Sequence, residues 1–208
     1  MILTHGANSL NRGVEIGGRR YPVVKIGNQL WMAENLDWKW TNLTVGGSYV
    51  NDGNPHAWYY NNDESTYGAN GNKYGLLYNT AAMEELVNGQ IELPANWRVP
   101  TYNDFNILYT LVGSNNAAKL KSVDGWISGN GTDDYGFNGK PTGAIVVTAS
   151  PYSPAGVGEY ANFYSQTEYS STRQYGMWLY YNSPNIDLPG AYVSKGNAMS
   201  IRLVKDAT

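Results

Sequence analysis

The chain has 208 residues, a length typical of one domain with a sizeable hydrophobic core. Its net charge of −3, without any run of Lys and Arg, argues against a nucleic-acid partner, and the absence of cysteine excludes disulfides, thiolate zinc sites and cysteine nucleophiles. No apolar run reaches the ~18 residues of a membrane span, so no membrane insertion is expected. The first residues lack the pattern of a signal peptide, so either the protein is not exported by that route or its signal lies outside this sequence.

The N-terminal segment divides into an arm and the start of a sheet. Residues 1–13 are polar and are predicted to form a loose arm, whereas residues 14–208 are predicted to form a single domain. Val14–Ile16 and residues 20–26 alternate in a way that predicts a hairpin around Gly17 and Gly18.

A second turn and a long irregular region follow. Gly27 and Asn28 predict a turn into a strand over residues 29–32. Residues 41–75 are rich in Gly, Asn, Asp and Tyr and show little periodicity, so we expect packed loops around scattered aromatic side chains.

Two helices are predicted in the middle of the chain. The first covers residues 80–87 and ends before Gly89. The second begins after Thr101, where Asp104 completes a capping box, and ends at Gly113. Its expected apolar face consists of Phe105, Leu108, Tyr109 and Leu111.

After a short helical turn predicted over residues 117–121, the pattern returns to strands. Ser, Gly, Asn and Pro separate these strands as loop residues do. A hairpin, two helices and then several strands indicate an α+β fold. The expected C-terminal strands are residues 144–149, 163–166, 177–181 and 199–204.

Candidate catalytic groups are few. The two histidines, His5 and His56, lie in predicted loops, where a lone histidine is usually a solvated side chain. Asp133 and Asp134 are adjacent carboxylates that suit calcium binding or acid/base chemistry, but neighbouring side chains rarely point into one site. We therefore expect no enzyme, no cofactor and no metal site.

The segment from Tyr160 to Asp206 has a distinctive composition. Tyrosines are interleaved there with Ser, Asn and Gly. Antibody loops use this mixture because Tyr gives a large contact area at a small entropy cost, while the small polar residues adapt their hydrogen bonds. The composition alone leaves two interpretations open, a binding surface or a sheet whose aromatic residues cover the core.

Short motifs along most of the chain carry a family resemblance. They are GNQLWMAENL (27–36), YGLLYN (74–79), PANWRVPT (94–101), KLKS with GW (119–126), GFN (136–138), YSQTEY (164–169) and SIRLVK (200–205). In this order they resemble the Fibrobacter succinogenes major paralogous domain, which is common in gut Bacteroidetes. The resemblance covers roughly residues 14–206.

The resemblance implies a C-type lectin-like fold, with paired N- and C-terminal strands, two helices and a loop-rich ligand face. It places Trp31 and Leu36 in the core, and Glu34 and Asn35 in contact with neighbouring backbone groups. The catalytic cysteines of sulfatase-modifying relatives and the calcium-dependent sugar motifs of animal lectins are absent.

The last segment also resembles the variable region of proteins diversified by retroelements, in which adenines of a template are randomised. Asn codons altered in this way cannot give Gln, Glu, Lys, Met or Trp. The resemblance therefore implies a fixed scaffold at Gln166, Glu168, Gln174, Met177, Trp178, Lys195 and Met199. The expected contact residues are Thr172, Arg173, Tyr175, Tyr181, Asn182, Ser183, Asn185, Asp187, Tyr192, Ser194 and Asn197.

Together these observations predict a non-catalytic, receptor-binding display protein, carried on a phage particle or displayed outside the cell. Its partner would be a protein or glycan on a cell surface. A fixed carbohydrate-binding lectin or adhesin of a gut bacterium is the alternative, and an enzyme that uses Asp133 or Asp134 is a third. The sequence leaves the ligand and the oligomeric state, including a trimer, open.

Overall fold

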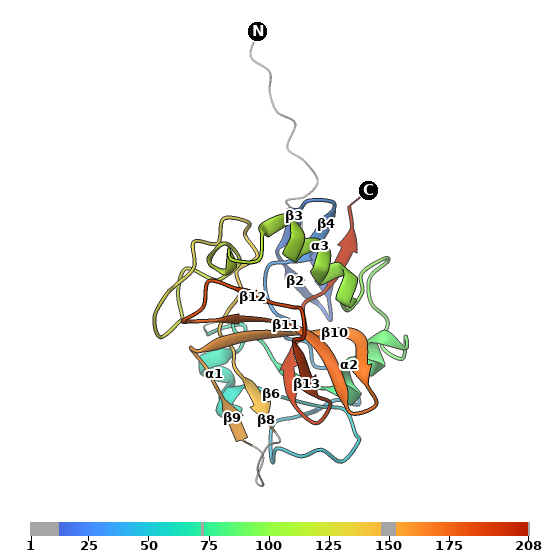
Figure 1. The fold of residues 1–208 in the computed structure, drawn as a ribbon. Helices are drawn as coiled ribbons and strands as arrows, with labels where there is room; N and C mark the ends of the chain where they lie inside the picture. Colours follow the sequence, from blue (N-terminus) through green and yellow to red (C-terminus); the bar gives the residue numbers. More distant parts are fainter. Residues whose placement is uncertain (1–12, 72, 147–152, 208) are drawn as a thin grey trace.

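The computed structural model describes residues 13–71, 73–146 and 153–207. Strands greatly outnumber helices, and the elements follow an α+β order, as predicted. A small group of N- and C-terminal strands lies at one end of the molecule, and a long hairpin of β10 (Tyr160–Ser170) and β11 (Arg173–Tyr180) crosses its middle (Figure 1).

The N-terminal hairpin is shorter than predicted. Strand β1 (Val14–Ile16) pairs with β2 (Arg19–Tyr21) through a turn in which Gly17 and Gly18 have φ angles of 58° and 77°. The prediction of one strand over residues 20–26 is wrong, because the chain changes sheet at Pro22. Proline has no N–H to donate to a ladder, so it suits such a boundary.

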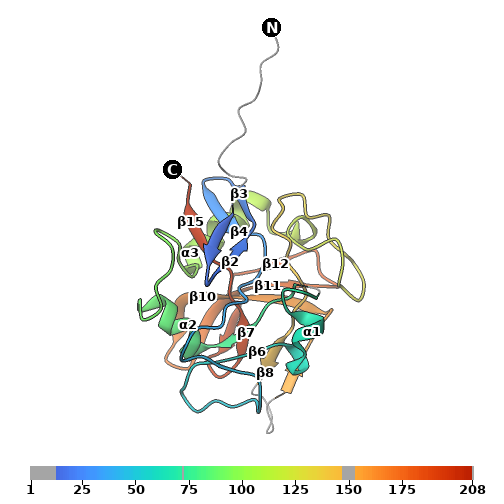
Figure 2. The same cartoon turned by 180° about the vertical axis from the view of Figure 1, so that it is seen from behind.

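The next strands join the two ends of the described chain. Strands β3 (Val23–Ile26) and β4 (Gln29–Met32) form a hairpin, and β15 (Val204–Asp206) pairs antiparallel with β4, placing Val204 opposite Trp31. This confirms the expected pairing of N- and C-terminal strands. Figure 2 shows β15 beside β4 from the rear.

Residues 41–75 contain more regular structure than predicted. This region contacts β7 through Asn79, whose side chain accepts a hydrogen bond from the His56 backbone N–H at 3.0 Å. The elements found there are β5 (Thr44–Val45), β6 (His56–Trp58), the 3₁₀ turn η2 (Tyr60–Asn62) and α1 (Glu64–Tyr67).

The largest sheet has ten strands within the described ranges. Its main path runs in the order β12-β11-β10-β14-β7-β6-β5, while β13 pairs with β11 and β8 pairs with both β14 and β9. Its remaining strands are β7 (Leu77–Asn79), β8 (Ala144–Val146), β9 (Ser153–Ala155), β12 (Ile186–Asp187), β13 (Tyr192–Ser194) and β14 (Ala198–Ser200).

Two helices pack against the β10–β11 hairpin from opposite sides (Figure 1). Helix α2 (Thr80–Val87) shares one core cluster with Tyr164, and α3 (Tyr102–Val112) shares the other with Phe163. Because successive strand residues point to opposite faces, β10 separates the two clusters. A 3₁₀ turn, η3 (Ala117–Lys119), follows α3.

The helix predictions are largely confirmed. Helix α2 has the predicted bounds, and both bonds of the Thr101–Asp104 capping box are present. The apolar face of α3 needs one correction, since Leu111 is 45% exposed while Val112 is buried. Leu111 lies beside the turn between β3 and β4, where a Cβ at Gly27 would meet it at 2.6 Å.

The C-terminal strands are longer and more divided than predicted. Strand β10 extends beyond the predicted residues 163–166 at both ends, and β11 begins four residues before the predicted strand over residues 177–181 and ends at Tyr180. The expected strand over residues 199–204 is two strands in different sheets, β14 and β15, and only residues 144–146 of the expected strand at 144–149 lie among the described residues. Strand β13, which was not predicted, adds an edge to β11.

Candidate binding face

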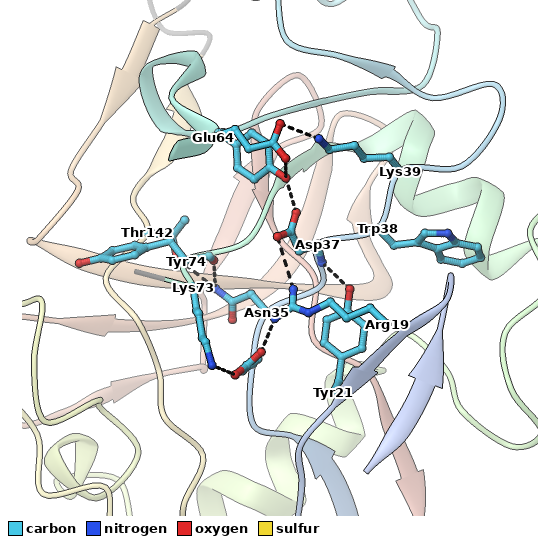
Figure 3. A network of polar contacts seen from close by, with 12 residues as sticks. Arg19, Tyr21, Asn35, Asp37, Trp38, Lys39, Glu64, Lys73, Tyr74 and Thr142 are labelled. Atoms are coloured by element: carbon cyan, nitrogen blue, oxygen red, sulfur yellow. Dashed lines mark hydrogen bonds and ion pairs between the residues drawn. The ribbon is translucent and has the colours of Figure 1, made fainter. Parts of the chain in front are cut away.

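Asn35, in the stretch that follows β4, joins several loops through its side-chain hydrogen bonds, and we term this network the brace (Figure 3). Asn35 Nδ2 donates to the Tyr74 carbonyl at 2.8 Å and to Thr142 Oγ1 at 3.0 Å, which confirms its expected contact with backbone. The same expectation for Glu34 is wrong, because Glu34 forms ion pairs with Arg19 at 2.5 Å and Lys73 at 3.4 Å. The polar residues of this stretch therefore hold loops together.

A buried arginine completes the brace. Arg202 is fully buried, and its Nη2 and Nε donate to Asn35 Oδ1 at 2.6 and 3.2 Å. Its guanidinium also lies over the rings of Phe137 and Phe163, with centroid distances of 4.3 and 5.1 Å. Burial lowers the pKa of Arg202, and the Coulombic attraction of Asp133 partly offsets that effect.

The candidate catalytic groups are held in structural contacts. His56 is 8% exposed rather than solvated, because β6 places it in the sheet, where its ring stacks on Trp58 and its Nε2 lies 3.0 Å from Asp52 Oδ1. Burial raises the pKa of Asp133, although its Oδ1 accepts a hydrogen bond from the Asn138 backbone N–H at 2.6 Å. His5 lies outside the described residues.

The described residues contain neither a cluster of metal ligands nor a membrane-spanning helix. Within residues 13–71, 73–146 and 153–207, no three His, Asp or Glu side chains gather as a metal site would require. In the same ranges no helix has the length and apolarity to cross a bilayer.

The predicted contact residues divide into three sets. Asn197 is only 7% exposed, so its burial argues against a direct contact role. The others lie at the two ends of β11, which are separated by about 25 Å along the strand. One set is Thr172, Arg173, Tyr175, Tyr192 and Ser194; the other is Tyr181, Asn182, Ser183, Asn185 and Asp187.

Three residues of the first set, Arg173, Tyr175 and Tyr192, meet Tyr102 and Tyr169 in a cluster at the surface. We term these five residues the tyrosine face. The rings of Tyr169 and Tyr192 stack with centroids 4.3 Å apart, and the Arg173 guanidinium lies 4.5 Å from the Tyr192 centroid. Tyr175 contacts both Tyr102, at 4.7 Å, and Tyr169, at 5.2 Å. Tyr169 is 47% exposed and Tyr192 is 38% exposed, so the cluster presents ring surface to solvent.

The backbone explains how these side chains meet. The register of β11 and β13 places Tyr175 opposite Tyr192 and Arg173 opposite Ser194, on one face of the sheet. An irregularity in the β10–β11 pairing between Glu168 and Ser170 accompanies the outward position of Tyr169.

Sequence reasoning missed Tyr102 and Tyr169. Tyr102 was assigned only to a helix start, and it reaches the face because its backbone N–H donates to Thr167 Oγ1 of β10 at 3.0 Å. Tyr169 ends the YSQTEY motif, so it was assigned to the family resemblance and not considered as an exposed residue. The available signal was its position beside the Ser-Ser-Thr turn.

The second set surrounds the other end of β11. Asp187 lies opposite Trp178 in the β11–β12 ladder, and the Tyr181 backbone N–H donates to the Glu159 carbonyl at 2.7 Å. Lys121 Nζ donates to the Tyr180 carbonyl at 3.1 Å, and burial lowers the pKa of this lysine. These residues form a more polar surface than the tyrosine face.

The residues expected to be a fixed scaffold make internal contacts. Gln174, Met177 and Met199 are at most 1% exposed. Gln166 Nε2 donates to the Val99 carbonyl at 2.6 Å, and Lys195 is ion-paired with Glu168. Trp178 stacks with Tyr180 and is half-buried.

The fold and the face define a mixed α+β domain that presents tyrosine rings and an arginine from a sheet hairpin. A family model, the Fibrobacter succinogenes major domain, matches residues 24–205, and the chain belongs to this family. The family inferred from the short motifs is thereby confirmed. A comparison with curated proteins finds none that matches.

Proposed function

We propose that this chain is a non-catalytic display protein that binds a receptor through its tyrosine face. The observation that carries the proposal is the cluster itself, in which four tyrosines and Arg173 meet at the surface. Tyr and Arg are enriched among the residues that dominate binding energy at interfaces. Each ring already contacts another ring, so little side-chain freedom is left to lose on binding.

The proposal includes a C-type lectin-like fold. The antiparallel pairing of β4 with β15 supports it, because this fold closes by joining its N- and C-terminal strands. The two helices on opposite sides of the β10–β11 hairpin support it as well.

The proposal also makes the chain a variable target of a diversity-generating retroelement. Its support is the separation of two residue sets along one segment. Gln174, Met177 and Met199, which randomised Asn codons cannot encode, are buried. Thr172 and Arg173, which such codons reach, are exposed.

The experiment is deep sequencing of this gene and its flanks across a source population. The proposal expects substitutions confined to adenine-derived codons between Tyr160 and Asn197, beside a near-copy template and a reverse-transcriptase gene. Evenly distributed drift without such a cassette would reject the retroelement role and favour a lectin or adhesin with a fixed site. A glycan array on the purified protein then tests that alternative.

A further inference from the structure

A groove lies between α2 and the β10–β11 hairpin. Its volume is about 180 Å³, and its lining consists of Met83, Glu84, Val87, Asn88, Gln166, Glu168 and Gln174. Glu168 is the register partner of Gln174, so both side chains leave the hairpin on the same face. That face is opposite to the one that carries Tyr175, so the groove and the tyrosine face flank the same hairpin.

The groove combines an apolar wall with a carboxylate rim. Helix α2 supplies the wall through Met83, which is 1% exposed, and Val87, which is 39% exposed. The rim carries Glu84 and Glu168, both exposed, one on each side. Lys195 reaches Glu168 as an ion pair, so an ammonium group already contacts this rim.

Gln174 gives a second and independent indication of a ligand. It is 1% exposed, and its Nε2 donates to the Ser165 carbonyl at 2.8 Å, which fixes the orientation of the amide. No group of the described chain donates to its Oε1. A buried acceptor without a donor is unfavourable, so a hydrogen-bond donor in the groove gains this oxygen as a partner once the side chains that cover it move aside.

We infer that this groove binds a basic side chain, Lys or Arg, of a polypeptide partner. The methylene stem of such a side chain packs on Val87, above the buried Met83, and its cationic end meets Glu84 and competes with Lys195 for Glu168. A sugar is a poorer fit, because the lining holds no aromatic ring on which a sugar stacks. The groove and the tyrosine face lie on opposite faces of the same hairpin, so a polypeptide receptor seated on the tyrosine face reaches the groove by extending a basic residue around the hairpin.

This inference rests on the proposed function only for the identity of the partner, and its test uses the free protein. The probe is the peptide acetyl-Ala-Arg-Ala-amide, compared with the citrulline peptide of the same length and shape but without the charge. Binding is followed by NMR of ¹³C-labelled methionine methyl groups. Met83 reports on the groove, and Met32, which is fully buried on β4 and does not line the groove, is the internal control.

The expected result is a saturable shift of the Met83 signal with the arginine peptide, a much weaker one with the citrulline peptide, and none at Met32. Glu84→Gln and Glu168→Gln should each weaken binding about threefold to fivefold, as loss of one partly exposed ion pair does. Glu92→Gln makes the same charge change at an exposed site outside the groove and should have no effect.

Three results would overturn the inference: an unresponsive Met83 signal, equal binding of the citrulline peptide, or equal weakening by Glu92→Gln. Tyr192→Ala separates this test from that of the proposed function, because it should leave peptide binding in the groove unchanged. A negative result for peptide binding in the groove therefore does not contradict the tyrosine face, and loss of receptor binding by Tyr192→Ala does not contradict the groove.

Discussion

The brace around Asn35 and the tyrosine face use similar chemistry in opposite ways. At the brace, an arginine lies over two aromatic rings in the core, and its guanidinium N–H groups donate to Asn35 and to neighbouring carbonyls. At the face, Arg173 lies over one ring, that of Tyr192, at the surface.

This difference indicates where substitutions should be tolerated. A buried cation depends on each acceptor around it, so changes at the brace should cost stability. An exposed ring or cation keeps its contact with water when a neighbour is removed, so changes at the face should affect binding instead.

The largest effect is expected at the brace. Asn35→Ala removes the acceptor shared by two nitrogens of Arg202 and should lower the free energy of unfolding by about 3 kcal/mol. Urea denaturation measures this loss. Asn182→Ala, at an exposed position, is the matched control, and similar losses in both variants would contradict the comparison.

Acid should lower the stability of the fold, because it protonates Asp104. Burial alone would raise the pKa of Asp104, but hydrogen bonds from Arg98 and Thr101 outweigh it and hold the pKa below its ordinary value. Because the unfolded pKa is about 3.9, this stabilisation is complete above that pH and is lost as the pH falls through the folded pKa.

Thermal melting from pH 5 to pH 2.5 tests this expectation. Asp104→Asn should be less stable than the wild type at pH 5, and the gap should narrow on acidification. A gap that stays constant would assign the acid sensitivity to other carboxyl groups.

A smaller effect is expected at the start of α3. Thr101→Ala removes the hydroxyl that accepts from the Asp104 backbone N–H and should cost about 1 kcal/mol. Thr172→Ala, at the exposed hairpin turn, should leave the denaturation midpoint unchanged. A loss of stability in the second variant equal to that in the first would contradict this assignment.

The smallest change in stability is expected at the tyrosine face. Tyr192→Ala should alter the free energy of unfolding by no more than about 0.5 kcal/mol, and Tyr175→Ala by slightly more, since Tyr175 packs on Tyr102. Peptides selected from a random display library on the wild-type protein should bind both variants at least about fivefold more weakly. Unchanged binding, or a large loss of stability, would make these rings part of the core.

The success of prediction from the sequence depends on whether a feature is local. The capping box of α3 needs only Thr101 and Asp104, which are three residues apart, and it was predicted correctly. His56 was misjudged because its burial depends on Asn79 and on strand partners far along the chain. Strand β13 was missed for the same reason. It forms by pairing with β11, and the turn residues close to β13 in the sequence do not indicate that pairing.

The candidate site follows the same rule. The composition of the C-terminal segment left a contact surface as one of two interpretations, and the codon argument of the retroelement resemblance supplied Arg173, Tyr175 and Tyr192. Tyr102 could not be included, because its place on the face depends on how α3 packs against β10. Asn197 was included on the codon argument alone, which carries no information about its burial.

The pairing of β4 with β15 has a consequence for how the protein is made. Asn35 and Arg202 are separated by 167 positions, and Trp31 pairs with Val204 across a similar span. Contacts between such distant residues form late and slow folding. During translation, the brace therefore forms only after Arg202 and Val204 have left the ribosome, and until then Trp31 and Asn35 lack the strand and the guanidinium that cover them.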